Sequence, residues 1–155
     1  MAENEQMIKA VIFQLNDEEY GVDVHQVQSI ERMIHITRVP KMPDFVKGVI
    51  NLRGVVTPII DLKERFSIET TEYTDSTRII IVQVDDKEVG LIVDSANDVI
   101  DIPTEKIEQP PEVVGKIESD YIRGVAKLDD RLLILLNLNK VLNAEELAAI
   151  ANIEA

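Results

Sequence analysis

An internal repeat limits the possible folds of this chain more than any other feature of its sequence. Residues 11–24 resemble residues 80–93, and residues 45–52 resemble residues 121–128. Two glycine pairs anchor this alignment: Gly21 with Gly90 at an offset of 69 positions, and Gly48 with Gly124 at an offset of 76. Self-similarity on this scale indicates two copies of one structural unit. The sequence therefore predicts a duplicated fold.

Each copy carries two patterns that are typical of β-hairpins. An aliphatic run breaks at an acidic turn at residues 16–19 in the first copy and 85–88 in the second. A later run breaks at residues 53–54 and 129–130. The aliphatic content of 21 Ile and 18 Val against 12 Leu also favours strands, because β-branched side chains pack well on pleated surfaces. We therefore expect four or five short strands per copy, which suits a small β-barrel.

The repeat divides the chain into four expected segments. These are a first barrel at residues 8–66, a connection at 67–77, a second barrel at 78–142 and a C-terminal helix at 143–155. A barrel of about 65 residues is marginal alone, because small domains bury a low fraction of their surface. We therefore expect the two barrels to share an aliphatic seam. The repeat also permits the halves to exchange terminal strands.

Three short segments have helical patterns. The apolar residues Val24, Val27 and Ile30 have helical spacing in the first copy, whereas the matching segment of the second copy is more typical of extended chain. Asp61 precedes a single predicted helical turn that ends at Phe66. The Asp61 side chain can cap the start of this turn. The C-terminal segment has a similar cap before an amphipathic run.

Composition excludes several classes of function. The chain has 16 Lys and Arg against 29 Asp and Glu, a net charge of −13, which argues against nucleic acid or an anionic membrane as a partner. It has no cysteine, which excludes disulfides and thiolate chemistry. No apolar run is long enough to cross a bilayer and the N-terminus is acidic, so we expect a cytoplasmic protein without membrane insertion. Because aromatic residues are only 4% of the chain, we expect an aliphatic core.

No pattern in the sequence indicates catalysis. His25 and His35 lack carboxylates at ligand spacing, and we expect the first on the helical segment and the second on a strand. The acidic pairs at 85–86 and 129–130 could form a carboxylate dyad or a metal site, but Asp is common at hairpin turns for structural reasons. We predict no catalytic residue, no metal site and no cofactor. A hydrolase or metal enzyme that uses the acidic turns stays a remote alternative.

The two repeats share their apolar scaffold and differ at one hairpin tip. The first copy has Arg53-Gly54 where the second has Asp129-Asp130. An exposed turn arginine is one interpretation, and pairing of its guanidinium with a carboxylate of this chain or of a partner is the other. Gly48, which comes before Arg53 in the same run, is expected to ease a bend or bulge in its strand.

These residues resemble those of the CheW family of chemotaxis coupling proteins, over residues 8–147. The most specific stretch is residues 43–62, from Pro43-Asp44-Phe45 to Ile60-Asp61-Leu62, with further support from residues 19–24 and 121–124. The resemblance implies two intertwined SH3-like five-stranded β-barrels without catalytic activity. It also implies a scaffold that links the cytoplasmic tips of chemoreceptors to the regulatory domain of the histidine kinase CheA.

The resemblance also implies which residues face the receptor, in a groove between the barrels. They are Val27, Gly48, Asn51, Leu52, Arg53 and Gly54. Many relatives carry Glu where this chain has Ser29, and that Glu pairs with the arginine; here Glu31 or Asp23 could take its place. A CheV-type adaptor module or a kinase regulatory domain are the alternatives within the same fold.

Overall fold

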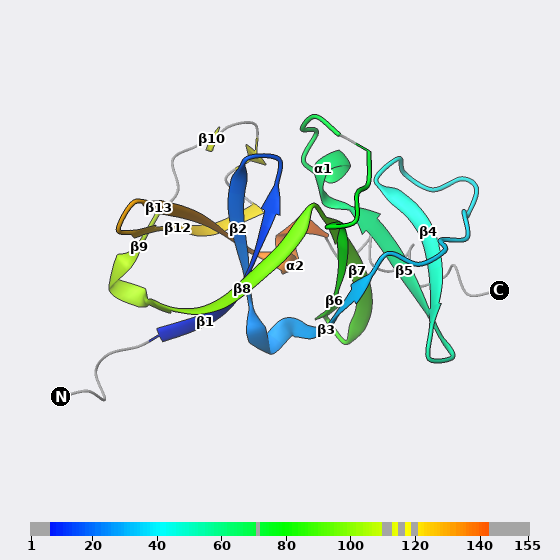
Figure 1. The fold of residues 1–155 in the computed structure, drawn as a ribbon, viewed down its shortest axis with the longest axis horizontal. Helices are drawn as coiled ribbons and strands as arrows, with labels where there is room; N and C mark the ends of the chain where they lie inside the picture. Colours follow the sequence, from blue (N-terminus) through cyan, green and yellow to red (C-terminus); the bar gives the residue numbers. More distant parts are fainter. Residues whose placement is uncertain (1–6, 71, 110–112, 115–116, 119–120, 143–155) are drawn as a thin grey trace.

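A computed structural model describes residues 7–70, 72–109, 113–114, 117–118 and 121–142 (Figure 1). In the first repeat the elements are β1 (Met7–Leu15), β2 (Glu18–Asp23), the 3-10 helix η2 (Val24–Gln26), β3 (Val27–Arg32), β4 (Val46–Leu52), β5 (Val55–Asp61) and α1 (Leu62–Arg65). In the second repeat they are β6 (Arg78–Val84), β7 (Lys87–Val93), β8 (Ser95–Pro103), the 3-10 helix η3 (Thr104–Lys106), β9 (Ile107–Glu108), β10 (Val113–Val114), β11 (Ile117–Glu118), β12 (Ile122–Leu128), β13 (Arg131–Leu136) and α2 (Leu138–Val141).

The strands form two large sheets, which lie side by side in Figure 1. Sheet A has six strands in the order β8-β1-β2-β13-β12-β9, and sheet B has five in the order β3-β6-β7-β5-β4. Strands β10 and β11 pair separately. The predicted fold class, mostly β with two SH3-like barrels and few helices, is confirmed. The predicted hairpins are confirmed as β1–β2, β4–β5, β6–β7 and β12–β13.

Each of the two large sheets contains strands from both sequence repeats. Hairpin β1–β2 of the first repeat lies in sheet A with strands of the second repeat, and hairpin β6–β7 of the second repeat lies in sheet B with strands of the first. Each exchanged hairpin is joined to its host sheet by one parallel pairing, β2 with β13 and β7 with β5, and by one antiparallel pairing, β1 with β8 and β6 with β3. The exchange that the repeat permitted therefore involves a whole hairpin from each half.

The exchange produces three apolar clusters. One lies inside sheet A and one inside sheet B, and both consist of aliphatic side chains alone. The third and largest contains residues of both sheets and forms the seam between them. Strand β1 shows how a strand serves two clusters: Ile12 faces the interior of sheet A, whereas Val11 and Phe13 face the seam. Strands buried on both faces have continuous apolar sequences rather than alternating ones.

The seam departs from the expected aliphatic core, because it holds most of the aromatic residues. Phe13, Tyr20, Phe66 and Tyr121 form a column of stacked rings, with neighbouring centroids 5.9, 6.3 and 5.5 Å apart. The guanidinium of Arg65 lies 5.3 Å from the Tyr121 ring centroid and also contacts Phe45. Few aromatic residues therefore suffice, because they are placed at the interface between the sheets.

The glycine pair that begins the repeat alignment has a packing role. An added Cβ on Gly21 would lie 2.9 Å from the side chain of Leu135, and one on Gly90 would lie 2.4 Å from the side chain of Ile59. Both glycines lie at the parallel pairing where an exchanged hairpin meets its host sheet. The absence of a side chain lets the sheet interior pack against these strands.

Two expectations on local structure are wrong. The segment with helical spacing, Val24 to Ile30, forms the short helix η2 and then strand β3, because β3 pairs with β6 along its length. His35 is not in a strand; it is exposed in the connection that follows β3. The other histidine, His25, is exposed on η2 as expected.

The cap predicted at Asp61 is confirmed. Its carboxylate accepts hydrogen bonds from the backbone N–H groups of Lys63 and Glu64, at 2.9 and 3.4 Å, and α1 ends at Arg65. The segment that follows, residues 67–70 and 72–77, contains no helix or strand and lies between β5–α1 and β6. The predicted C-terminal helix, at 143–155, lies outside the described residues.

Replacement of Phe66 by alanine tests the aromatic seam. Phe66 is 3% exposed and stacks on two other rings, so Phe66→Ala should lower the free energy of unfolding by about 3–5 kcal/mol. Because both sheets share the seam, unfolding should stay a single transition. Urea titration followed by far-UV circular dichroism measures both, since the chain has no tryptophan.

The exposed Val55→Ala variant is the control, with an expected change within about 0.5 kcal/mol. Two separate transitions in Phe66→Ala, or a loss below about 1 kcal/mol, would contradict the shared seam.

Candidate protein-docking site

Five of the six residues predicted to face a receptor lie on hairpin β4–β5. Asn51 and Leu52 end β4, and Arg53 and Gly54 form its two-residue turn. Both turn residues have positive φ, 53° and 85°, as expected for the tight turn that suits the twist of paired strands. The Asn51 side chain accepts a hydrogen bond from the Gly54 N–H at 2.9 Å, which fixes the turn. The tip is therefore a rigid, exposed projection.

Gly48 lies in the same hairpin but has a structural role. It lies at a bulge in the β4–β5 register, with φ at 142°. A Cβ there would lie 2.0 Å from the carbonyl oxygen of Thr37, which accepts a hydrogen bond from the Val49 N–H. The expected bulge is confirmed, and glycine is needed because another backbone segment crosses β4 at this point.

Arg53 pairs with Glu31. Its Nη2 lies 3.3 Å from Glu31 Oε2, with the arginine side chain 72% exposed and the glutamate 22%. Of the two carboxylates that could replace the glutamate usual at Ser29, the structure therefore selects Glu31, two residues further along β3. The pair leaves most of the guanidinium open to solvent, so it can exchange its partner for another carboxylate.

Asp23 binds His25 and Arg123 rather than Arg53. Its carboxylate accepts a hydrogen bond from the His25 N–H and contacts His25 Nδ1, both at 2.9 Å, and lies 3.6 Å from Arg123. Partial burial raises the pKa of Asp23, but the hydrogen bonds from His25 and the nearby charge of Arg123 outweigh this and hold the pKa below its ordinary value. Asp23 therefore stays charged and caps η2.

Val27 is not brought to the hairpin tip. It begins β3, four residues before Glu31, or about 13 Å along an extended strand. Its side chain packs against the seam cluster rather than beside Arg53. The structure therefore unites Gly48, Asn51, Leu52, Arg53 and Gly54 on one hairpin and leaves Val27 in a separate place.

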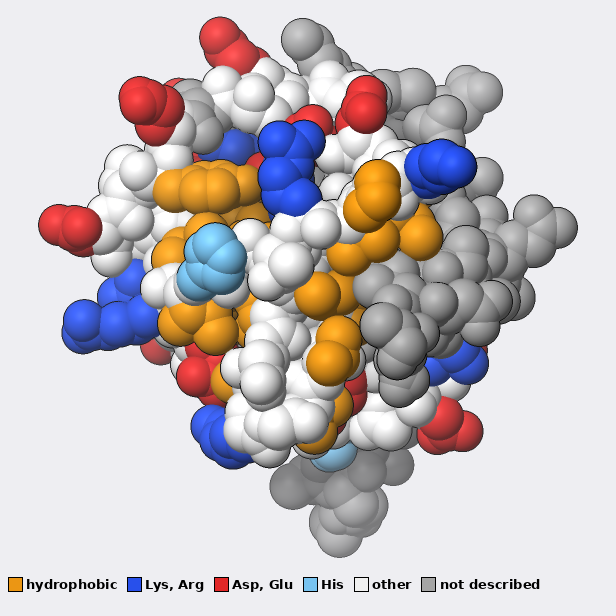
Figure 2. Space-filling view, turned by 90° about the vertical axis from the view of Figure 1, so that its right-hand side faces the viewer, with side chains coloured by type: hydrophobic (Ala, Val, Ile, Leu, Met, Phe, Trp, Pro, Cys, Tyr) orange, Lys and Arg blue, Asp and Glu red, His pale blue; other side chains and the backbone are white. Residues whose placement is uncertain are grey.

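A set of exposed aliphatic side chains lies on β3 and β5 and was not predicted from the sequence. Val55 and Val56 continue the hairpin beyond its tip with 52% and 48% of their surface exposed, and Ile30 on β3 is 43% exposed. By the repeat alignment, Ile30 matches Val99 and Val56 matches Leu132, and both counterparts are also exposed. Figure 2 shows hydrophobic and basic side chains close together on the side of the molecule that carries β4. The repeat alignment could have indicated these exposed positions, because both repeats have aliphatic residues there.

Charge is unevenly distributed along the chain, although the overall excess is acidic. Residues 32–65 contain seven Lys and Arg against three Asp and Glu. Arg38 and Lys41 are exposed beside a hollow of about 730 Å³ next to β4. Within the described ranges, neither forms an ion pair. No local basic patch was expected from the sequence, so this region is a correction to that expectation.

The positions and partners of the acidic turn pairs and of the Tyr73 hydroxyl bear on catalysis. The acidic pairs at 85–86 and 129–130 lie in exposed hairpin turns, as predicted, and Asp85, Asp86 and Asp129 have positive φ. No group of three or more His, Asp or Glu in the part that the structure describes could hold a metal ion. The Tyr73 hydroxyl donates to Asp61 at 3.0 Å, and burial together with this carboxylate raises the pKa of Tyr73 well above its ordinary value. Tyr73 therefore stays protonated.

The structure also bears on membrane insertion. Among the helices of the described residues, none combines the length and the apolar character needed to cross a bilayer.

Comparison with known proteins identifies the family. The model of the CheW-like domain matches residues 9–146. The chain is similar to the chemotaxis protein CheW of Bacillus subtilis, with 47% identity over 88% of each chain. It is similar to the chemotaxis protein CheW of Klebsiella aerogenes, with 39% identity over 92% of this chain and 86% of that protein. The crystal structure of the scaffolding protein TtCheW from Thermoanaerobacter tengcongensis superposes with a TM-score of 0.83 at 38% identity, covering 91% of each chain. The protein described here is a member of the CheW-like domain family.

Proposed function

We propose that this protein is a non-enzymatic adaptor of bacterial chemotaxis. It acts in the cytoplasm, where it links the signalling tips of chemoreceptors to the regulatory domain of the histidine kinase CheA. The proposal is supported by the names of its relatives, chemotaxis protein and scaffolding protein. The observation that carries it is the β4–β5 tip, where an exposed arginine is held by Glu31 on a rigid turn.

The tip has the features of a protein-docking site. Arg53 offers a planar cation to a carboxylate, and Val55 and Val56 beside it offer apolar contact area. Hot spots in interfaces combine these two kinds of contact, a central arginine or apolar anchor surrounded by residues that exclude water. A receptor tip with acidic and aliphatic side chains on one helical face would complement this hairpin.

The excess of basic residues in the segment 32–65, which includes hairpin β4–β5, favours an acidic partner. Residues 32–65 carry a net positive charge, whereas the rest of the chain is strongly negative. Complementary charge mainly accelerates association and orients the partner, rather than adding much affinity. The receptor should therefore approach sheet B at its basic side.

The kinase should meet different surfaces. The strand edges of sheet A, together with the exposed Val99 and Leu132 on that sheet, give this barrel partly apolar ends. A regulatory domain with the same double-barrel fold could pair with these ends in a pseudo-symmetric manner. This arrangement separates the kinase contacts from Arg53.

Charge reversal at the tip tests the receptor contact. Arg53→Asp should weaken binding of a receptor signalling fragment by at least about tenfold, because it repels both Glu31 and any partner carboxylate. Kinase binding should change less, and the circular dichroism spectrum should stay unchanged. Co-sedimentation with the receptor fragment, with and without the kinase, measures both affinities.

The matched control is Arg131→Asp, the same change at an exposed arginine of the other repeat that also pairs with a glutamate, Glu19. It should leave receptor binding near the wild-type value. Equal loss of both partners in Arg53→Asp, or equal loss of the receptor in both variants, would show that the tip is not the receptor site.

Divalent metal titration tests the non-enzymatic assignment. Since the acidic turns are exposed hairpin turns without a third ligand in the described residues, Mg²⁺, Ca²⁺, Mn²⁺ and Zn²⁺ should bind only weakly. Isothermal titration calorimetry should show no 1:1 site with a dissociation constant below about 10 μM. A tight stoichiometric site that is lost in Asp85→Asn or Asp129→Asn would revive a metal-dependent activity.

A further inference from the structure

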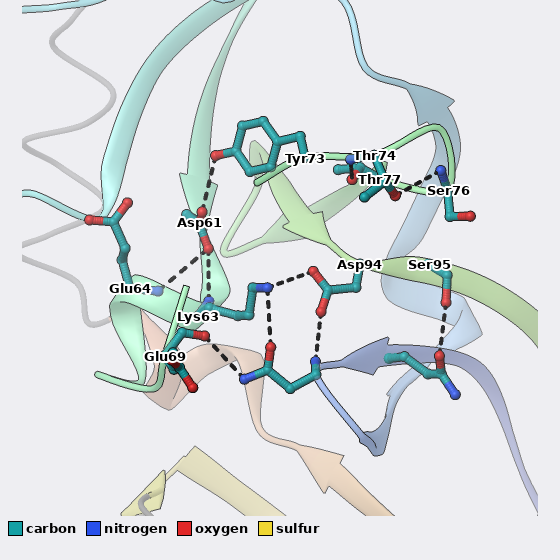
Figure 3. Close-up of polar contacts among 12 residues, drawn as sticks. Asp61, Lys63, Glu64, Glu69, Tyr73, Thr74, Ser76, Thr77, Asp94 and Ser95 are labelled. Carbon is teal, nitrogen blue, oxygen red and sulfur yellow. Dashed lines mark hydrogen bonds and ion pairs between the residues drawn. The ribbon is translucent and has the colours of Figure 1, made fainter. Parts of the chain in front are cut away.

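A buried lysine joins three segments where the chain passes from sheet B to sheet A. Lys63 lies in α1, which follows β5 of sheet B, and its side chain is 3% exposed. Figure 3 shows this side chain extended toward Asp94, the residue between β7 of sheet B and β8 of sheet A. The Lys63 Nζ lies 2.7 Å from Asp94 Oδ1 and also donates to the Asn16 side-chain oxygen at 3.3 Å. Asn16 belongs to the β1–β2 turn of sheet A.

The remaining polar groups of this cluster are also paired. Asn16 donates its backbone N–H to Asp94 Oδ2 at 2.6 Å, so both carboxylate oxygens accept a bond. The Asn16 side-chain amide donates to the carbonyl of Glu69 at 3.1 Å. Asp94 also donates its own N–H to the carbonyl of Gln14 at 3.0 Å. The Asn16–Lys63–Asp94 cluster therefore ties sheet A directly to the helix and the strand junction of sheet B.

Because the Lys63 ammonium group is buried, it needs partners for its charge and its hydrogen bonds. An ammonium group removed from water is costly unless it is paired and hydrogen-bonded, and loss of one partner leaves a buried charge without compensation. Within the cluster only Lys63 is buried, since Asp94 is 28% exposed and Asn16 is exposed. Several bonds nevertheless link these three residues, so a shift of one segment would break them together. The segments it joins are therefore held in a fixed relative position.

The second junction of the duplicated fold has no such cluster. By the repeat alignment, Asn16, Lys63 and Asp94 match Asp85, Asn139 and His25. These three counterparts are exposed, and the His25 ring contacts Asp23 instead. In the described residues, no bond is found among the three. Among the described residues, this arrangement of a buried lysine with Asn16 and Asp94 is therefore present at one junction and has no equivalent at the other.

We propose that the Asn16–Lys63–Asp94 cluster is a one-sided lock that sets the angle between sheets A and B. The shared apolar seam holds the sheets together but is less directional, because apolar packing tolerates small shifts better than a buried ion pair does. With the lock in place, relative movement of the sheets pivots about this junction and is larger at the unlocked one. This inference concerns the isolated chain and does not depend on the receptor or the kinase.

Spin labelling tests the angle directly, because the chain has no native cysteine. Cysteines at Glu88 on sheet B and Lys127 on sheet A, both exposed, would carry nitroxide labels. In the Lys63→Met background the distance distribution from double electron–electron resonance should become broader than in the parent. Asp94→Asn, which keeps the shape of the side chain and removes its charge, should broaden it in the same direction.

Hydrogen exchange shows whether the effect is local. In both variants, amides of residues 14–18, 62–69 and 93–96 should exchange at least about tenfold faster, while those of β6 and β13 keep their wild-type rates. The control is Arg131→Gln, which removes the exposed bidentate pair with Glu19 and should change neither measurement.

Unchanged distance distributions together with junction exchange within about twofold of wild type would overturn the proposal. Equal acceleration throughout both sheets would also overturn it, since the cluster would then only add to general stability. If Lys63→Met does not fold, the milder Asp94→Asn variant decides between these outcomes.

Discussion

Each sheet of this protein is completed by a hairpin from the other repeat, and the rest of the structure depends on that exchange. Strands β1 and β6 are apolar on both faces, so each must be covered on two sides. One face fills the interior of the host sheet and the other faces the seam. Two separate barrels could not provide both coverings. The parallel pairings of β2 with β13 and β7 with β5 allow the exchange, and Gly21 and Gly90 leave room for it.

The proposed docking tip and the proposed lock both lie where the two repeats differ. The shared positions are apolar and build the clusters, which explains why the repeat is visible in the sequence. At the hairpin tips the first copy places Arg53 where the second places Asp129, and at the junctions the first copy places Lys63 where the second places Asn139. A duplicated scaffold thus presents different charges at equivalent places. This asymmetry underlies both proposals, the docking tip at Arg53 and the lock at Lys63.

Strands, hairpin turns and the Asp61 cap were predictable, since each depends on residues close together in the chain. The helical pattern from Val24 to Ile30 was misleading, because spacing in a short segment cannot show that β6 is available as a neighbour. The structure places five of the six predicted site residues on one hairpin, because they are close together in the sequence. Val27 comes from another strand, on which only the fold decides the neighbours. Whether these residues bind a receptor stays a prediction.

The sequence by itself determined the duplication, the β content and the position of each hairpin, because all three follow from local patterns of apolar and turn residues. The tertiary structure decided which hairpin enters which sheet, that Glu31 rather than Asp23 pairs with Arg53, and that Asn16, Lys63 and Asp94 meet. Those contacts join residues separated by 22 to 78 positions. Their partners are chosen by sheet order and burial, which no local pattern encodes.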